Sequence, residues 1–121
     1  MTKEKNETSQ LLEVVIKSIQ EKKANDVVCL KLDKLQNSIA SYFIVCHGNS
    51  NTQVNAIADS VIEMVKKETG LSPVNREGFE NSEWILLDYF DIVIHIFQKD
   101  SREFYQLEKL WADADVKKYE D

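Results

Sequence analysis

The sequence predicts one α/β domain of the α+β type, with a mixed β-sheet of four to five strands and helices on one face. Hydrophobic periodicity changes along the chain in the order helix, strand, strand, helix, strand, strand, strand, helix. A long amphipathic segment between the second and third strands indicates a crossover, whereas the other connections suit antiparallel pairing. The length of 121 residues, with 43% hydrophobic and 30% charged residues, suits a single buried core.

The first part of the chain predicts one helix and two strands. Residues 1–7 are polar and are expected to be a disordered N-terminus. Thr8–Lys23 has apolar residues at three- and four-residue steps, which is typical of an amphipathic helix. Val27–Leu32 is rich in valine and leucine and predicts a strand. After a polar connection over residues 33–41, Tyr42–His47 predicts a second strand, apolar on both faces and therefore central.

The second helix has the clearest start and stop signals. Ser50 and Gln53 have the spacing of a capping box, and Gly70 is placed to end the helix. Pro73 supports this end because proline cannot continue a helix. The predicted buried stripe between these signals consists of Val54, Ile57, Ala58, Val61, Met64 and Val65.

A hairpin is predicted for the following segment. After a short strand at Val74–Arg76, the strands Glu83–Asp88 and Asp91–Phe97 are separated only by Tyr89 and Phe90. A two-residue connection would place Trp84 opposite His95. Alternation then predicts a core face of Ile85, Leu87, Ile92, Ile94 and Ile96. The other face carries Trp84, Leu86, Asp88, Asp91, Val93, His95 and Phe97.

The C-terminal segment predicts a last helix and a tail. Asp100 and Glu103 have capping-box spacing. The expected apolar face of this helix is Phe104, Leu107, Leu110 and Trp111. Residues 8–111 are therefore expected to form the domain, and residues 112–121 a charged, loose C-terminal tail.

Composition excludes several classes of protein. The net charge of −6 argues against a broad contact with nucleic-acid phosphates. Cys29 and Cys46 lie in apolar runs and are expected to be buried free thiols of a reducing compartment. The sequence shows neither a signal peptide nor an apolar run of membrane-spanning length, so no membrane contact and a cytoplasmic location are expected.

The residues give little support to catalysis. The chain has no glycine-rich phosphate loop, no nucleophile elbow and no metal-ligand spacing around His47 and His95. Cys46 and His47 are neighbours in a strand, so they point to opposite faces and cannot act as a nucleophile–base pair. Gly48-Asn49-Ser50 could offer backbone N–H groups to an anion, but every capped helix start looks similar. No catalytic residue, metal or cofactor is therefore predicted.

The polar face of the hairpin has two interpretations. It combines aromatic residues with carboxylates, and residues 75–97 contain five carboxylates but one arginine. The structural interpretation is a partly covered sheet face with Trp84 packed under a loop. The functional interpretation is an exposed binding face, because tryptophan at the centre of a charged rim is typical of interaction hot spots.

Several motifs occur together, in order, between about Leu11 and Trp111. The sequence reads Asn37-Ser-Ile-Ala-Ser-Tyr-Phe-Ile-Val-Cys, Gly48-Asn-Ser, Gln53-Val-Asn-Ala-Ile-Ala-Asp, Glu77-Gly, Trp84-Ile-Leu-Leu-Asp, Asp91-Ile-Val-Ile-His-Ile-Phe and Arg102-Glu-Phe-Tyr-Gln-Leu-Glu-Lys-Leu-Trp. This combination resembles the ribosomal silencing factor family, also called RsfS or Iojap. The resemblance implies a fold similar to nucleotidyltransferases without their catalytic carboxylates.

The resemblance also implies a function. Such proteins bind the large ribosomal subunit through its universal interface protein, number fourteen of the large-subunit series. They block association with the small subunit and repress translation in nutrient-poor or stationary phase. A role in large-subunit maturation and a homodimer of the free protein are also implied. The acidic bias fits a basic protein partner and little direct contact with nucleic acid.

The resemblance assigns roles to eight residues. Trp84 would be the apolar anchor, extended by Leu86 and His95. Asp88, Asp91 and Glu77 would meet basic side chains, and Tyr89 and Phe90 would cap the contact. Each of these residues also has a structural interpretation; for example, Trp84 could be core and Asp91 could only shape the turn. The family usually has aspartate where this chain has Ser41, and glycine where it has Phe90.

Two other functions remain open at this point. One is a nucleotidyltransferase-like enzyme, degenerate or active, that holds a phosphate at Gly48-Asn49-Ser50. The other is a protein-interaction domain that acts away from the ribosome.

Overall fold

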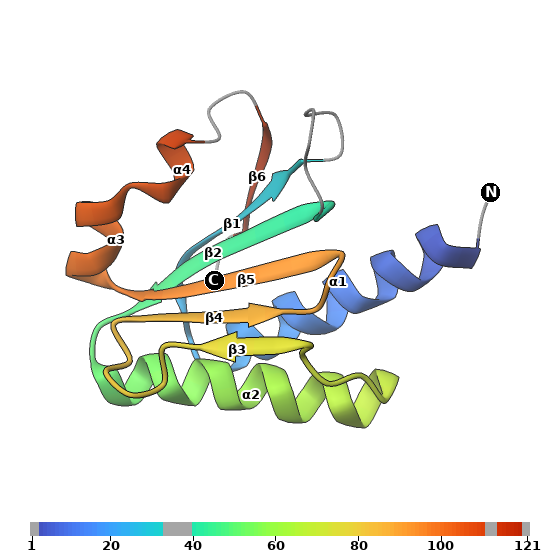
Figure 1. The fold of residues 1–121 in the computed structure, drawn as a ribbon, viewed down its shortest axis with the longest axis horizontal. Helices are drawn as coiled ribbons and strands as arrows, with labels where there is room; N and C mark the ends of the chain where they lie inside the picture. Colours follow the sequence, from blue (N-terminus) through green and yellow to red (C-terminus); the bar gives the residue numbers. More distant parts are fainter. Residues whose placement is uncertain (1–2, 33–39, 111–113, 120–121) are drawn as a thin grey trace.

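The computed structural model describes residues 3–32, 40–110 and 114–119 as one mixed α+β unit (Figure 1). Its sheet has six strands in the order β3-β4-β5-β2-β1-β6. The fold class is the predicted one, but the sheet is wider than the four to five strands expected. The additional strand comes from the segment expected to be a loose tail.

The two long helices follow from their caps and apolar stripes. α1 spans Lys3–Glu21 and thus begins within the segment expected to be disordered. α2 spans Asn51–Thr69, and its N-cap is confirmed: the Ser50 hydroxyl accepts from the Gln53 backbone N–H at 3.1 Å, while the Gln53 side chain accepts from the N–H of Asn49. Gly70 ends α2 at a φ of 80°, and its N–H donates to the carbonyl of Lys66.

The centre of the sheet is a parallel pair. β2 (Tyr42–Gly48) pairs in parallel with β5 (Ile92–Gln98), and the other strand pairs are antiparallel. β1 (Asn25–Lys31) borders β2, and β4 (Trp84–Asp88) borders β5. The predicted short strand is confirmed as β3, at Asn75–Glu77. The connection from β2 to β5 runs through α2, as expected for parallel neighbours.

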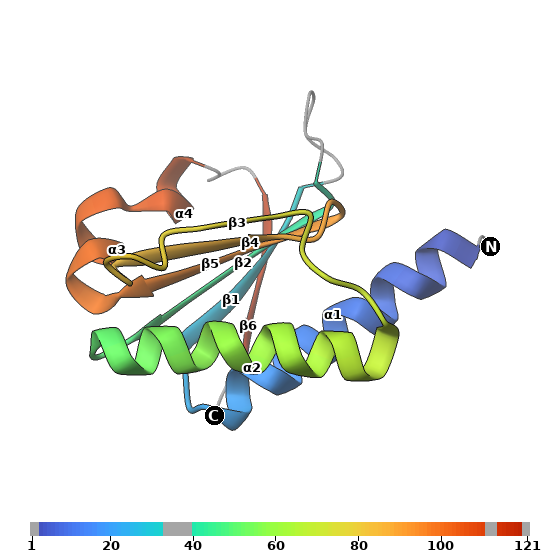
Figure 2. The same ribbon diagram turned by 60° about the horizontal axis from the view of Figure 1, so that its bottom comes forward.

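The main core lies between the sheet and the layer of α1 and α2, which run together on one side of the sheet (Figure 2). The predicted aliphatic set is confirmed there: Ile85, Leu87, Ile92, Ile94 and Ile96 are each 0% exposed. Burying a side chain of this size contributes about 1.5–3 kcal/mol to the stability of the folded state.

Both cysteines are buried free thiols, and burial raises their pKa to about 11 for Cys29 and about 12 for Cys46.

The C-terminal helical segment differs from the prediction of one helix. α3 spans Lys99–Tyr105 and α4 spans Leu107–Leu110, with Gln106 between them in a left-handed conformation at a φ of 49°. Gln98 occupies the N-cap without a side-chain hydrogen bond, so the expected capping box at Asp100 is wrong. Because of this break, Phe104 and Leu107 lie in different helices and do not form the single apolar face expected.

These helices lie at one end of the sheet, on the side opposite α1 and α2 (Figure 2). Leu107 is buried there, so the expectation of helices on one face only is also corrected. Phe104 and Leu110, predicted as core, are 78% and 74% exposed. Trp111 lies outside the described residues.

Part of the expected C-terminal tail is a strand. β6 (Asp115–Tyr119) pairs antiparallel with β1, from Val27↔Tyr119 to Lys31↔Asp115. Without this strand, the backbone N–H and C=O groups along that edge of β1 would have no sheet partner. The polar sequence of β6 gives almost no alternation, which explains why it was not predicted.

The hairpin register is displaced from the prediction by two residues. Trp84 pairs with Phe97, and Leu86 pairs with His95. The turn residues are Phe90 and Asp91, because the Tyr89 N–H donates to the carbonyl of Ile92 at 2.9 Å. Since a shift of two preserves alternation, the paired strand residues keep the faces predicted for them.

A tight contact at Gly78 yields the first testable prediction. Gly78 has a φ of 90°, and a Cβ built there would lie 2.0 Å from the carbonyl oxygen of Trp84. Gly70 also has positive φ, but nothing lies within 4 Å of its Cβ position. Gly78→Ala is therefore expected to lower the free energy of unfolding by about 3–5 kcal/mol, and Gly70→Ala by about 1 kcal/mol. Urea denaturation of both variants measures the difference, and equal losses would contradict the close contact.

Candidate functional site

An aromatic cluster occupies the outer face of the sheet, the face opposite α1 and α2. Trp84 projects from β4 and packs against Phe97 of β5, with ring centroids 4.8 Å apart. Tyr105 at the end of α3 covers another part of the indole, at 4.9 Å. The indole Nε1–H donates to Nδ1 of His95 at 3.1 Å. Trp84 is therefore fixed by two ring contacts and one hydrogen bond while staying partly exposed.

His95 lies beneath this face. It is 4% exposed, and the ring of Phe43 packs edge-on against it at 4.8 Å. Because Nδ1 accepts the indole hydrogen, the neutral ring carries its proton on Nε2. That atom has no hydrogen-bond partner among the described residues. Burial lowers the pKa of His95 to about 4, so the ring is neutral at physiological pH.

A group of half-buried apolar side chains surrounds Trp84 on the outer face. Leu86 lies on β4 opposite His95, and Val93 lies on β5 next to Phe43 of β2. Phe43, Trp84, Leu86 and Val93 are all intermediate in exposure and are called the outer-face patch below. A surface of this kind is too exposed for a core and unusually apolar for a solvated face.

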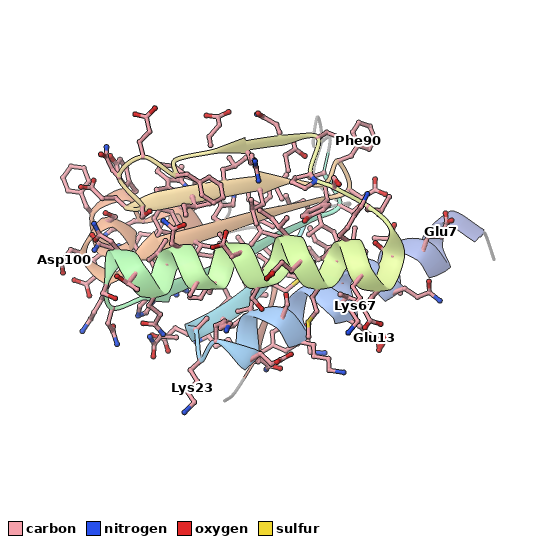
Figure 3. The ribbon with its side chains drawn as sticks, turned by 90° about the horizontal axis from the view of Figure 1, so that it is seen from below. Glu7, Glu13, Lys23, Lys67, Phe90 and Asp100 are labelled. Carbon is pink, nitrogen blue, oxygen red and sulfur yellow. The ribbon has the colours of Figure 1, made fainter. Side chains whose placement is uncertain are left out.

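The four predicted residues of the hairpin tip have different environments. Phe90 is 63% exposed and lies at the end of the sheet opposite Asp100 (Figure 3). Tyr89 is 6% exposed within the helix-facing core, and burial raises its pKa to about 12. The Asp88 carboxylate accepts from the Phe90 N–H at 2.7 Å. Asp91 accepts from the Thr8 hydroxyl at 3.2 Å. Phe90 thus offers most of the surface, and the carboxylates hold the turn.

Glu77 lies at the edge of an acidic groove beside Trp84. This groove has a volume of about 880 Å³. Its carboxylates are Asp59, Glu77, Glu80 and Glu83, against the single cation Arg76. The guanidinium of Arg76 lies 5.6 Å from the centre of the Phe79 ring. The groove therefore presents net negative charge next to the outer-face patch.

The structure brings some predicted site residues together and separates others. Trp84, Leu86 and Asp88 share the outer face, with Glu77 on the neighbouring strand. Tyr89 lies in the opposite core and His95 is buried, so neither is an exposed contact residue in this structure. Sequence reasoning missed Phe43 and Tyr105. The alternation of β2 could have placed Phe43, but the position of Tyr105 depends on how α3 packs against the sheet.

At the start of α2, the segment Gly48-Asn49-Ser50 was considered as a phosphate loop, but donors there are used in the helix cap. The Asn49 N–H donates to the side-chain oxygen of Gln53 at 2.8 Å, and the Gln53 N–H donates to Ser50. These donors already have partners within the helix cap.

Among the described residues, no group of three histidine, cysteine or acidic side chains could hold a metal ion. Within the same residues, no helix is long and apolar enough to cross a membrane.

Comparison with known proteins places the chain in a family. A family model described as "Ribosomal silencing factor during starvation" matches residues 5–121. The chain belongs to the ribosomal silencing factor family. The "Ribosomal silencing factor RsfS" of Halalkalibacterium halodurans is 43% identical over 105 residues, covering 87% of this chain and 88% of that protein. Membership agrees with the motifs at the Trp84 strand and at α3.

Two further similar proteins are informative. A crystal structure of a protein from Chromobacterium violaceum superposes with a TM-score of 0.81 at 36% identity, covering 86% of this chain and 85% of that one. The mouse "Mitochondrial assembly of ribosomal large subunit protein 1" is 26% identical, covering 84% of this chain and 45% of the mouse protein. The fold of the Chromobacterium violaceum protein thus matches most of this chain.

The buried His95 predicts a dependence of stability on pH. Its pKa of about 4 lies below the ordinary 6.5, so between these pH values the unfolded chain binds a proton that the folded protein does not. Above pH 6.5, proton binding by His95 does not lower the free energy of unfolding. As the pH falls toward 4, this free energy decreases by up to about 3 kcal/mol.

The variant His95→Phe isolates this contribution, because phenylalanine fills the aromatic site but does not titrate. Urea denaturation at pH 7.0 and at pH 4.5 is expected to show a smaller loss of stability for the variant than for the parent protein. Both proteins retain His47 and all carboxylates, so their other titrations cancel in the comparison. Equal pH dependence of the two proteins would show that His95 titrates normally.

Proposed function

We propose that this protein binds the large ribosomal subunit through that subunit's universal interface protein, number fourteen of the large-subunit series. Bound there, it occupies the surface that the small subunit needs and so represses translation when nutrients are short. Membership in a family named for ribosomal silencing supports this function. The name of the mouse relative refers to assembly of the large ribosomal subunit, which supports the same partner.

The outer-face patch is the observation that carries the proposal. An aromatic anchor held in place by neighbouring rings needs little ordering when a partner binds, and tryptophan is enriched at the centres of interfaces. Trp84 is held in this way by Phe97, Tyr105 and His95. Binding then needs no catalytic group, because occupancy of the surface is sufficient to exclude the small subunit.

The charge beside the patch favours a protein partner over ribosomal RNA. The groove with Glu77 and Glu83 is acidic, and carboxylates repel nucleic-acid phosphates. A basic ribosomal protein would instead be attracted, mostly through faster association. On this proposal the protein acts in the cytoplasm, and the free protein forms a homodimer.

Co-sedimentation with isolated large subunits tests the proposal. The parent protein is expected to pellet with the subunits, and Trp84→Glu is expected to lose at least about 90% of this binding, because interface tryptophans contribute roughly 2 kcal/mol or more. Leu71→Glu is the matched control: Leu71 is 48% exposed and lies outside the outer face, in the segment after α2. Leu86→Glu provides a second test within the patch.

Circular dichroism of each variant separates loss of binding from loss of folding. Failure of the folded parent protein to bind would contradict the ribosomal function. If the parent and both patch variants bind equally, the function stands and the outer-face patch is the wrong surface. A translation assay with separated subunits then measures whether bound protein slows subunit joining.

Charge reversal tests the acidic groove separately. Glu77→Lys combined with Glu83→Lys is expected to weaken binding to the large subunit by roughly tenfold and to reduce its dependence on salt. Glu13→Lys combined with Glu63→Lys changes the net charge equally, but Glu13 lies on α1 (Figure 3) and Glu63 lies on α2. Equal weakening by both pairs would show that only the overall charge matters.

A further inference from the structure

A second cavity lies at the opposite side of α3 from Trp84, and the proposed ribosome contact does not use it. It has a volume of about 810 Å³. It is enclosed by the start of β1, the end of β2, the segment α3–α4 and the end of β6, which lie close together in Figure 1. This volume is within the range of sites for small ligands.

Arg102 organises the wall of this cavity. Its Nε and Nη2 donate to the two carboxylate oxygens of Glu108, at 3.1 and 2.9 Å. Its Nη1 lies 2.9 Å from Nδ1 of His47 and also reaches the carbonyl of Asn25. The side chain of Arg102 is 10% exposed. This cation is therefore committed to structural partners and fixes the positions of the groups around it.

The contact with Arg102 determines what His47 can offer. A guanidinium remains protonated and has no acceptor, so Nδ1 of His47 must accept from it. The neutral ring then carries its proton on Nε2. Burial, with a smaller contribution from Arg102, lowers the pKa of His47, which keeps the ring neutral. His47 is 6% exposed and lines the cavity, so it is a nearly buried and oriented hydrogen-bond donor.

The remaining charges of the cavity favour an anion. Three lysines line it, namely Lys99, Lys109 and Lys118. After Glu108 is paired with Arg102, the carboxylates that remain are Asp26 and Glu103. The cavity is thus slightly positive in a chain whose net charge is −6. Val28 supplies an apolar part of the wall from the outer face, whereas the ring of Tyr119 packs against the helix-facing core.

We propose that this cavity binds a small anionic metabolite of the size and shape of a nucleoside monophosphate. The phosphate lies among the three lysines and accepts from Nε2–H of His47. The flat, uncharged body of the ligand lies against Val28. The site is distinct from the start of α2, where the backbone donors of the cap already have partners.

Calorimetry and NMR with adenosine monophosphate test this site on the free protein, without ribosomes. Adenosine monophosphate is expected to bind at millimolar concentration or below and to shift the signals of Val28, His47 and Tyr119. Adenosine lacks the anion and inorganic phosphate lacks the flat body, so each is expected to bind at least about tenfold more weakly. The His47 Nε2–H resonance is expected to move with adenosine monophosphate.

Paired variants provide the control. Lys99→Gln combined with Lys118→Gln is expected to weaken binding of adenosine monophosphate roughly tenfold. Lys17→Gln combined with Lys67→Gln removes the same charge from the exposed side of α1 and α2 and is expected to have no effect. Absence of binding by the folded parent protein overturns the proposal. Binding unchanged by the Lys99 and Lys118 pair, or equally strong binding of inorganic phosphate, also overturns it.

Discussion

The parallel pairing of β2 with β5 is the constraint on which the rest of the structure depends. Parallel neighbours cannot be joined by a tight turn, so the chain must cross over the sheet, and α2 forms that crossover. α2 comes to lie beside α1, and both helices cover the same face. Aliphatic side chains fill the space between these helices and that face of the sheet. The outer face is left to the short helices α3 and α4, which bury only Leu107 of their own residues. An incompletely covered apolar face is therefore a consequence of the topology.

The outer face is not merely uncovered, because its central residue is held in place. Trp84 is held by Phe97 and Tyr105 and donates to His95. Holding it has a cost: Nε2 of His95 is buried without a partner among the described residues. An unsatisfied buried donor costs about 1–3 kcal/mol. An apolar residue at position 95 would avoid that cost but would leave the indole N–H without its acceptor. The arrangement therefore favours a fixed tryptophan at the expense of some stability.

The sequence predicted those features that depend on local periodicity. The alternation of Ile92, Ile94 and Ile96 assigned the two faces correctly, even though the predicted turn was misplaced, because a two-residue shift does not change the face. The turn itself was missed because Phe90 adopts a φ of 74°, which a phenylalanine rarely does. Likewise, nothing in Gln106 signals the left-handed break that separates α3 from α4. In the candidate site, alternation placed Trp84 and Leu86 on the outer face, whereas no local pattern placed Tyr105 against Trp84 or Tyr89 in the helix-facing core.

A single buried cation explains how so short a helical segment stays on the outer face. α3 has seven residues and buries none of them, so its apolar contact with the sheet is limited to partly exposed side chains such as Tyr105. Arg102 instead connects α3 to α4 through Glu108, to β1 through the carbonyl of Asn25 and to β2 through His47. Such a buried charge is tolerable because each contact satisfies a donor and the carboxylate neutralises the guanidinium. The same seven-residue helix presents Arg102 to the second cavity and Tyr105 to Trp84. The two proposed binding surfaces therefore share α3, which contributes Tyr105 to one and Arg102 to the other.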